Sequence, residues 1–311
     1  MLAIQTQHLT KRFEGITAVE DLKLEVKKGE IFGLVGPDAS GKTTTIRMLC
    51  GILPADKGTG KVAGYDIFTE TESLKEKVGY LPQRFGLYGD LTVIENIHFY
   101  ADLYQVSKKK RKDRIEQLLL FANLEPFRKR KAQDLSGGMK QKLGLICSLI
   151  HTPEVLFLDE PTTGVDPLSR RDFWMILYDL LREGVTILFS TSYLDEAERC
   201  SRVGLIDRGS LLIADSPSAV KTQIGGTILE LRIESRREGM KLLESVPSFR
   251  SIVLSGDKIH ILVNDPQESE REIRDILKAH EVEILDLVVV PPSLEDAFVS
   301  MVKEREGRTP G

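Results

Sequence analysis

The chain has 311 residues, and its 43 Lys and Arg residues nearly balance its 47 Asp and Glu residues. Hydrophobic residues make up 41% of the chain and charged residues 29%, close to the averages for soluble globular domains. We therefore expect a folded chain with a sizeable core, long enough for about two domains. The near balance of charge argues against a protein whose whole surface binds a polyanion, and we expect no nucleic-acid partner.

The sequence predicts neither a membrane span nor a disulfide framework. No apolar run approaches the roughly 18 residues that a membrane-spanning helix needs. The first residues lack the basic and then apolar order of a signal peptide. The three cysteines, Cys50, Cys147 and Cys200, are too few and too scattered for a set of disulfides or a zinc site. A reducing cytosolic compartment is therefore expected.

The beginning of the chain predicts strands and then a turn into a helix. Apolar and charged residues alternate between Leu22 and Val26, which is typical of a strand with one wet face. Residues 31–35 are nearly all apolar, as expected of a strand covered on both faces. A glycine-rich turn at residues 36–41 and a helical stretch that ends near Gly51 follow.

The middle of the chain continues this alternation. Two more buried strands are predicted at residues 155–158 and 185–189, so the pattern indicates an α/β fold with a mainly parallel sheet. Between about residues 84 and 150, apolar residues recur at helical spacing, which predicts a helical subdomain inserted between two strands. Its basic run at residues 108–112 is interpreted as a solvated face, with proximity to anionic lipid as the alternative.

The last part of the chain predicts a second, smaller domain. We expect a first domain at residues 1–220 and an accessory domain at residues 221–311. In the accessory domain the predicted elements are a strand at 228–233, a helix at 237–245, strands at 251–254 and 258–263, a helix at 267–279, a strand at 282–290 and a last helix that Ser293 opens. The order β-α-β-β-α-β predicts a ferredoxin-like α+β domain.

The glycine-rich turn carries a phosphate-binding pattern. The sequence Gly36-Pro37-Asp38-Ala39-Ser40-Gly41-Lys42-Thr43 fits G-x-x-x-x-G-K-[ST]. In such a loop, backbone N–H groups converge on phosphate oxygens, and the helix that follows favours anions at its N-terminus. Lys42 is predicted to neutralise the β- and γ-phosphates, and the hydroxyl of Thr43 to bind Mg²⁺.

Two acids follow the predicted strand at residues 155–158. Ligands of open α/β sheets bind beyond the carboxyl ends of the strands, so Asp159 and Glu160 are placed beside the phosphate loop. Asp159 is predicted to hold Mg²⁺ through its water shell, and Glu160 to polarise an attacking water. A strand-end acid that is merely solvated is the alternative for each of them.

A third motif supports a family resemblance. The sequence Leu135-Ser136-Gly137-Gly138-Met139-Lys140-Gln141 resembles the signature of ATP-binding-cassette (ABC) ATPases. The resemblance covers residues 1 to about 220 and includes Phe13, Gln83 and the sequence Gly164-Val165-Asp166. It implies an α/β P-loop NTPase of the ABC type with an inserted helical subdomain, with ATP and Mg²⁺ as cofactors. It also implies a second cassette, because in this family the signature contacts the γ-phosphate bound to a partner subunit.

The resemblance assigns roles to individual residues. ATP-binding residues are expected at Phe13, Val19, Gly36, Pro37, Asp38, Ala39, Ser40, Gly41, Lys42, Thr43 and Thr44, signature contacts at Ser136, Gly137, Gly138 and Gln141, the D-loop at Asp166, metal contacts at Thr43, Gln83 and Asp159, and catalytic residues at Glu160, Gln83 and Ser192. Phe13 would stack on adenine, with an ordinary core aromatic as the alternative. Gln83 would touch Mg²⁺ or water and report to a membrane partner, with a surface-loop residue as the alternative.

Two positions depart from the family pattern. Ser192 lies where the family usually has the switch His, and serine has a shorter reach and carries no positive charge. The loss of one preorganised donor can cost about 10²–10³ in rate. We favour a heterodimer in which a partner supplies a complete site; the alternative is a homodimer that hydrolyses slowly or uses Ser192 through water. Ala39 and Ser40 replace the common Gly-Ala, so we expect residue 39 to have a negative φ.

The end of the chain refines the resemblance. The sequence Pro292-Ser293-Leu294-Glu295-Asp296-Ala297-Phe298 resembles that of drug-export ATPases, which pair with separate permeases of the ABC-2 type. The resemblance implies an ATP-hydrolysing export subunit, bound peripherally to the cytoplasmic face of the cell membrane through its permease. The alternatives are a soluble ABC ATPase that acts on ribosomes or DNA, and a degenerate regulatory subunit of a heterodimer. The accessory domain is expected to serve packing or dimerisation rather than ligand sensing.

Overall fold

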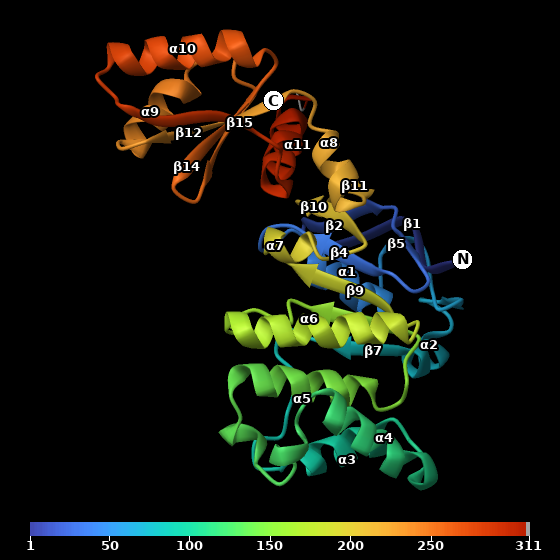
Figure 1. Cartoon of the computed structure of the whole chain (residues 1–311). Helices are drawn as coiled ribbons and strands as arrows, with labels where there is room; N and C mark the ends of the chain where they lie inside the picture. Colours follow the sequence, from blue (N-terminus) through green and yellow to red (C-terminus); the bar gives the residue numbers. More distant parts are fainter. Residues whose placement is uncertain (309–311) are drawn as a thin grey trace. The chain divides into compact units, whose positions relative to one another are not determined.

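The computed structural model describes the backbone of residues 1–308 and the side chains of residues 1–305. The chain divides into two compact units, Met1–Ala214 and Asp215–Gly311 (Figure 1). The boundary lies slightly before residue 220 because helix α8 (Pro217–Thr222) packs against helix α11 (Leu294–Arg308) of the second unit. Within residues 1–308 no helix combines the length and the apolar character that crossing a membrane requires.

The first unit is built on two sheets. Its strands are β1 (Leu2–Phe13), β2 (Ile16–Leu22), β3 (Glu25–Lys27), β4 (Ile31–Val35), β5 (Lys57–Val62), β6 (Tyr65–Asp66), β7 (Val78–Leu81), β8 (Val155–Asp159), β9 (Thr186–Thr191), β10 (Arg202–Asp207) and β11 (Ser210–Asp215). An antiparallel sheet has the order β2-β1-β5-β6, with β3 also paired to β1. The second sheet has the order β11-β10-β4-β9-β8-β7, and its strands from β10 to β7 are parallel.

Helices cover the parallel sheet, and a separate group of helices is inserted before β8. The covering helices are α1 (Lys42–Leu49), α2 (Thr71–Lys77), α6 (Pro167–Arg182) and α7 (Leu194–Ala197). The inserted helices are α3 (Val93–Leu103), α4 (Lys108–Phe121) and α5 (Gly137–Leu149), which Figure 1 shows together at one end of the unit. These helices confirm the predicted insertion. The core is apolar on both sheet faces: Phe32 and Ile46 are fully buried in a cluster with the antiparallel sheet, and the Trp174 ring packs at a tilt against that of Phe189.

The second unit has the predicted β-α-β-β-α-β order. Its elements are β12 (Thr227–Ile233), α9 (Arg236–Glu244), β13 (Ser251–Ser255), β14 (Lys258–Val263), α10 (Pro266–Ala279) and β15 (Ile284–Val290), followed by α11. The antiparallel sheet has the order β13-β14-β12-β15, which is the ferredoxin-like arrangement. Helices α9 and α10 pack against β12 (Figure 1), and α11 contacts β13. The α/β fold with a small α+β accessory domain is thereby confirmed.

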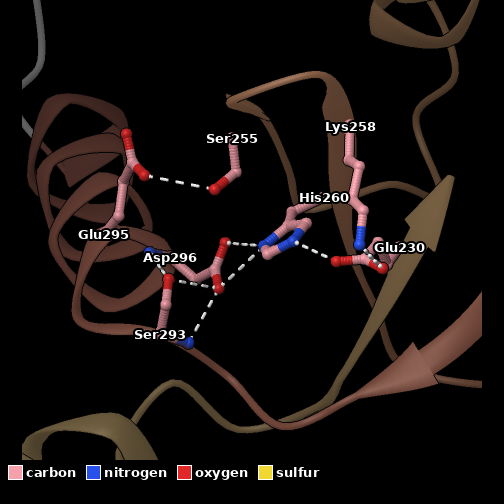
Figure 2. A network of polar contacts seen from close by, with 7 residues as sticks. All are labelled: Glu230, Ser255, Lys258, His260, Ser293, Glu295 and Asp296. Carbon is pink, nitrogen blue, oxygen red and sulfur yellow. Dashed lines mark hydrogen bonds and ion pairs between the residues drawn. The ribbon is translucent and has the colours of Figure 1, made fainter. Parts of the chain in front are cut away.

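A polar network attaches α11 to the sheet of the second unit. Figure 2 shows His260 of β14 between two carboxylates: its Nδ1 lies 3.0 Å from Asp296 Oδ1 and its Nε2 lies 3.2 Å from Glu230 Oε2. Lys258 pairs with the other oxygen of Glu230 at 2.6 Å. Ser293 caps α11 by accepting from the backbone N–H of Asp296 at 3.1 Å, and its hydroxyl donates to Asp296 Oδ2 at 2.6 Å. Lys258 and a protonated His260 therefore each contact a carboxylate of this network.

The network shifts the titration of its members. The hydrogen bond to Asp296 raises the pKa of His260, and this effect outweighs the burial that lowers it. Burial alone would raise the pKa of Asp296, but the hydrogen bonds from His260 and Ser293 lower it below its ordinary value. The hydrogen bond from Lys258 lowers the pKa of Glu230. The doubly paired imidazolium is thus the favoured form in the folded unit.

The second unit is expected to open more readily as the pH rises. Because the folded pKa of His260 lies above the unfolded value of about 6.5, its contribution is complete below that value and is lost as the pH rises through the folded pKa. The lowered pKa values of Asp296 and Glu230 have the opposite effect, since their contribution is lost only in acid. Hydrogen exchange of α11 and β14 in the full chain, corrected for the intrinsic pH dependence, should show less protection at about pH 9 than at about pH 6. The variant His260→Gln should lose this dependence, and an unchanged dependence would contradict the assignment.

Candidate functional site

The predicted site residues lie at one edge of the parallel sheet. Because β4, β9, β8 and β7 are parallel neighbours, their carboxyl ends meet at the same edge. The loop at residues 36–41 follows β4, and Asp159 ends β8. Thr191 ends β9, and Gln83 follows β7. Segments that are far apart in the sequence therefore converge here.

A cleft of about 860 Å³ opens at this edge, a volume in the range of ligand pockets. Its walls include the predicted residues Phe13, Asp38, Ala39, Ser40, Gly41, Lys42, Thr43, Thr44, Gln83, Glu160 and Ser192. The walls also include residues that the sequence did not single out, namely Ile16, Thr17, Ala18, Thr163, Tyr193 and Arg208. Asp159 lies directly behind this wall, bonded to Thr43.

Two glycines of the loop are required by close backbone approach. A Cβ on Gly36 would lie 2.1 Å from the carbonyl oxygen of Ile206, and a Cβ on Gly41 would lie 2.5 Å from the carbonyl oxygen of Ala18. Gly41 also has a φ of +105°, which residues with side chains rarely adopt. The loop can therefore curl against β2 and the end of β10 only with glycine at these positions.

The prediction of a negative φ at residue 39 is wrong. Ala39 has a φ of +62°, in the left-handed region that costs an L-residue about 1–2 kcal/mol. The loop holds this conformation by hydrogen bonds on both sides of the next residue: Ser40 N donates to Pro37 O at 3.2 Å, and Ser40 O accepts from Gly209 N at 2.9 Å. The side chain of Ala39 remains in the cleft wall.

Lys42 is held at the base of the loop. Its Nζ donates to the carbonyl oxygens of Gly36 and Pro37, at 2.8 Å each, and lies 3.1 Å from Oε1 of Glu160. Only 3% of the side chain is exposed. Gly36 and Pro37 do not line the cleft themselves, but their carbonyl oxygens orient the ammonium of Lys42. A partly desolvated ammonium in this position attracts an anion strongly.

Ser40 shows that the loop suits an anionic ligand. Its Oγ is buried and has no hydrogen-bond partner within the side chains that the structure describes, although Ser40 lines the cleft. Buried hydroxyls ordinarily have a partner. An acceptor oxygen in the loop, such as a phosphate oxygen, would satisfy this hydroxyl, so the residues present fit the predicted nucleotide.

Asp159 is the centre of a hydrogen-bond chain. Its Oδ1 accepts from Thr43 Oγ1 at 3.0 Å and from Ser190 Oγ at 2.9 Å, and Ser190 Oγ in turn accepts from the backbone N–H of Glu160 at 3.0 Å. Burial raises the pKa of Asp159, although the hydrogen bonds from Ser190 and Thr43 oppose this shift. Tyr80 donates to Oδ2 at 3.5 Å. Burial and the charge of Asp159 raise the pKa of Tyr80 to about 12, so it stays a neutral donor.

Glu160 is held in a strained and specific orientation. Its φ is +48°, which is rare for a residue with a side chain and marks local strain. While Oε1 pairs with Lys42, Oε2 accepts from Gln83 Nε2 at 3.3 Å and from Thr163 Oγ1 at 3.4 Å. The carboxylate therefore faces the cleft beside the phosphate loop.

The donor set around Asp159 suits a magnesium ion. Thr43 and Asp159 offer a hydroxyl and a carboxylate 3.0 Å apart, and Gln83 bonds the carboxylate of the next residue, Glu160. Mg²⁺ prefers a few hard oxygen ligands and keeps several waters or phosphate oxygens. The described residues contain no cluster of three or more His, Cys, Asp or Glu side chains that could hold a metal alone. A magnesium ion held by Thr43 and Asp159 would complete its coordination with water or phosphate oxygens.

The opposite wall of the cleft is aromatic and apolar. Phe13 is 44% exposed and lines the cleft beside Ile16, so it is not a core aromatic. Val19 is fully buried and does not reach the cleft, contrary to the prediction. The reason is the burial pattern of β2, in which Thr17 and Ala18 face the cleft and Val19 packs into the core.

The signature residues lie away from this cleft. Ser136 and Gly137 are exposed, and the hydroxyl of Ser136 caps α5 by accepting from Met139 N at 3.3 Å. Gly137 and Gln141 line a separate groove of about 440 Å³, whose walls also include Gln83. The structure therefore does not bring the signature to the phosphate loop of the same chain.

Gly138 and Asp166 lie at the contact of α5 with α6. A Cβ on Gly138 would lie 2.5 Å from the side chain of Ser169, so only glycine fits there. Asp166 is exposed and caps α6 by accepting from Ser169 N at 2.9 Å. Asp166 thus sets the start of α6, which packs against α5.

Ser192 lies where the sequence placed it. It follows the end of β9, is exposed and lines the cleft. Its hydroxyl makes no hydrogen bond within the described part of the chain. Tyr193 and Arg208, which line the cleft as well, carry no local sequence signal for this role, because their position depends on the packing of the strand ends.

Two family models match the chain. A model described as "ABC transporter" matches residues 19–163, and a model described as "ATP-binding protein DrrA1-3-like, C-terminal domain" matches residues 216–302. The chain is 41% identical to the probable multidrug ABC transporter ATP-binding protein YbhF of Escherichia coli (strain K12), over 94% of this chain and 51% of YbhF. It is 32% identical to the linearmycin resistance ATP-binding protein LnrL of Bacillus subtilis (strain 168), over 98% of this chain and 99% of LnrL.

A solved structure shares the same fold. The ATP-binding subunit of an ABC transporter is 27% identical to this chain, with a TM-score of 0.65, and the match covers 71% of this chain and 92% of that one. The chain spans about half the length of YbhF and nearly all of LnrL.

Proposed function

Because the chain belongs to the family of ABC transporter ATP-binding proteins, we propose that it hydrolyses ATP with Mg²⁺ to drive export through a separate membrane permease of the ABC-2 type. The observation that carries this proposal is the meeting of Lys42, Asp159 and Glu160 at one edge of the parallel sheet, with the ammonium of Lys42 3.1 Å from Glu160. Through the permease, the chain would be bound peripherally to the cytoplasmic face of the membrane.

Different residues of the cleft bind phosphate, bind the metal ion and activate water in this proposal. The N–H groups of the loop and the N-terminus of α1 attract phosphate, and Lys42 adds a positive charge. Thr43 and Asp159 would hold Mg²⁺, and the bound ion would neutralise phosphate charge. Glu160, fixed between Lys42 and Gln83, orients the attacking water and accepts its proton.

A second cassette completes the site in this proposal. The signature at Ser136 and Gly137 is exposed and away from the chain's own cleft, so it is available to a nucleotide on a partner. Helix N-termini with bare N–H groups favour anions. Asp166 is also exposed, at the start of α6, so in this proposal it is available to the partner cassette as well.

The exporter assignment is supported by the relatives. YbhF is named for multidrug transport and LnrL for linearmycin resistance. The second unit matches the C-terminal domain of DrrA1-3-like ATP-binding proteins, which also supports the assignment.

The expected result is that the full chain, purified from detergent-solubilised membranes of its source cells, carries a permease and hydrolyses ATP. Recovery with ribosomes or DNA instead would favour the soluble ABC ATPase, and binding without turnover would favour a regulatory subunit.

Restoring the switch His is expected to raise turnover. In Ser192→His, an imidazole at the exposed position on the cleft wall reaches farther than the serine hydroxyl and adds a donor to the γ-phosphate region. A single preorganised donor is worth about 10²–10³ in rate, so we expect at least about a tenfold gain in phosphate release at saturating ATP.

The variant Ser192→Ala provides the matched comparison. If serine works through water, alanine lowers turnover, and if the site is degenerate, alanine leaves turnover unchanged. A histidine variant without any gain, both alone and with the partner cassette, would exclude the degenerate site and the heterodimer that we favour on its account.

A further inference from the structure

A fully buried carboxylate lies just outside the cleft, on the short helix α7. Glu196 has no exposed surface, yet it accepts hydrogen bonds from two hydroxyls: Thr162 Oγ1 at 2.7 Å from Oε1, and Thr191 Oγ1 at 2.8 Å from Oε2. On the Oε1 side, Trp174 Nε1 and Arg170 Nε are each 3.5 Å away. Both oxygens of this carboxylate are therefore engaged.

The partners of Glu196 come from three segments, and two of these segments contribute residues to the cleft wall. Thr162 lies in the loop that directly follows Glu160, and Thr191 ends β9 directly before Ser192. Arg170 belongs to α6, which begins at the Asp166 cap. The carboxylate thus joins the loop of the general base, the switch position and the D-loop helix at one point.

The contact to Thr191 controls the backbone around Ser192. While its hydroxyl donates to Glu196, it accepts from the backbone N–H of Tyr193 at 2.9 Å, so the two neighbours of Ser192 are bonded to each other. The carbonyl oxygen of Thr191 accepts from Gly36 N at 3.3 Å. The side chain of Thr191 therefore orders the backbone around Ser192, while the phosphate loop is bonded by its backbone carbonyl alone.

Stability alone gives little reason for a carboxylate at this position. Burying a charge is costly unless it is paired and fully hydrogen-bonded, and apolar residues commonly fill such a site at least as well. Arg170 is the cation in contact with Glu196, and it also stacks on the Tyr193 ring at 4.6 Å. What an apolar residue cannot supply is the simultaneous bonding of three separate segments.

We propose that Glu196 is a positioning residue for hydrolysis, which holds Glu160 and Ser192 in fixed positions relative to α6. This inference rests on the proposed function. A displacement of α6 is transmitted through Glu196 to both sides of the cleft, whereas the contacts of Lys42 with the loop are untouched. The loss of Glu196 therefore lowers the rate of the chemical step more than it weakens nucleotide binding.

The variant Glu196→Gln tests this role with almost no change in volume. Trp174 and Arg170 are donors only, so the amide oxygen must face them and the NH₂ group must face Thr191. The Thr191 hydroxyl then loses its acceptor and turns away from its place beside Tyr193. Small misplacements of catalytic groups cost up to about 10²-fold, so kcat for ATP is expected to fall at least about tenfold while KM stays within about threefold.

The matched control is the neighbouring carboxylate on the same helix. Asp195 is 67% exposed, lies 3.8 Å from Arg170 and has no contact with Thr162 or Thr191. Asp195→Asn is expected to keep kcat within about twofold. In the double variant Glu196→Gln with Thr191→Val, kcat should fall no further than in the lower of the single variants, because both act through one contact. Thr191→Val alone carries the test if Glu196→Gln fails to fold.

The outcomes separate this inference from the proposed function. An unchanged kcat in Glu196→Gln, or an equal loss in Asp195→Asn, overturns the positioning role while leaving the ATPase assignment intact. An equal fall of affinity and rate also overturns it, because that indicates a general loss of structure. A wild-type chain without any turnover overturns the proposed function, and this inference with it.

Discussion

Glu160→Gln is expected to lower ATP turnover by about 10²–10⁴-fold, the usual contribution of a positioned general base. Glutamine keeps the size of the side chain but does not accept a proton from water. The contacts to Lys42 and Gln83 hold the carboxylate in the cleft, so little of the effect should come from movement of the side chain. Phosphate release at saturating ATP measures the rate, and nucleotide titration should show that ATP still binds.

Glu154, at the opposite end of β8 from Glu160, provides the control variant. Glu154 directly precedes β8, is half exposed and pairs with Lys77 at 3.3 Å. Glu154→Gln should therefore hydrolyse ATP at the wild-type rate. Turnover in Glu160→Gln close to that of Glu154→Gln would show that another group activates the water.

Lys42→Ala is expected to weaken nucleotide binding by about 10²-fold or more. Hydrogen bonds to charged groups contribute about 1.5–3 kcal/mol each, and this ammonium is both buried and aimed at the phosphate loop. The substitution also leaves Glu160 without its 3.1 Å partner, which adds repulsion toward phosphate. Titration with ADP measures the affinity without interference from hydrolysis.

An exposed lysine separates this local effect from the loss of one positive charge. Lys75 on α2 is 49% exposed and pairs with Glu72 at 2.7 Å. Lys75→Ala should bind ADP like the wild type. If both variants bind equally well, the ammonium of Lys42 is not a phosphate contact, and the nucleotide must bind in another way.

Much of the fold could be predicted because its signals are local. The apolar run of β4 and the glycine-rich loop after it mark a strand, a turn and a helix within a few residues. The order of strands and helices in the second unit is equally plain, since alternation and helical periodicity report which face of each element is buried. By contrast, β5 was not predicted: its sequence KGTGKV has two glycines and gains its strand conformation by pairing with β1.

The residues of the candidate site could be predicted from local motifs, but one backbone conformation in it could not. The motifs identified Lys42, Asp159 and Glu160, because each chemical role needs a particular residue type beside a strand end. The positive φ of Ala39 was missed, because it is held by hydrogen bonds to Pro37 and to a distant turn. Local patterns report conformation only where neighbours in the sequence determine it.

By itself the sequence therefore determined the order of the strands and helices with clear apolar patterns, the residue types of the phosphate loop and the family. Only the tertiary structure decided which segments meet. The parallel register of β4, β8 and β9 brings three strand ends to one edge, and the packing of α7 places Glu196 between Thr162 and Thr191. Such contacts depend on chain segments that are far apart, and periodicity along one segment carries no information about its distant partners.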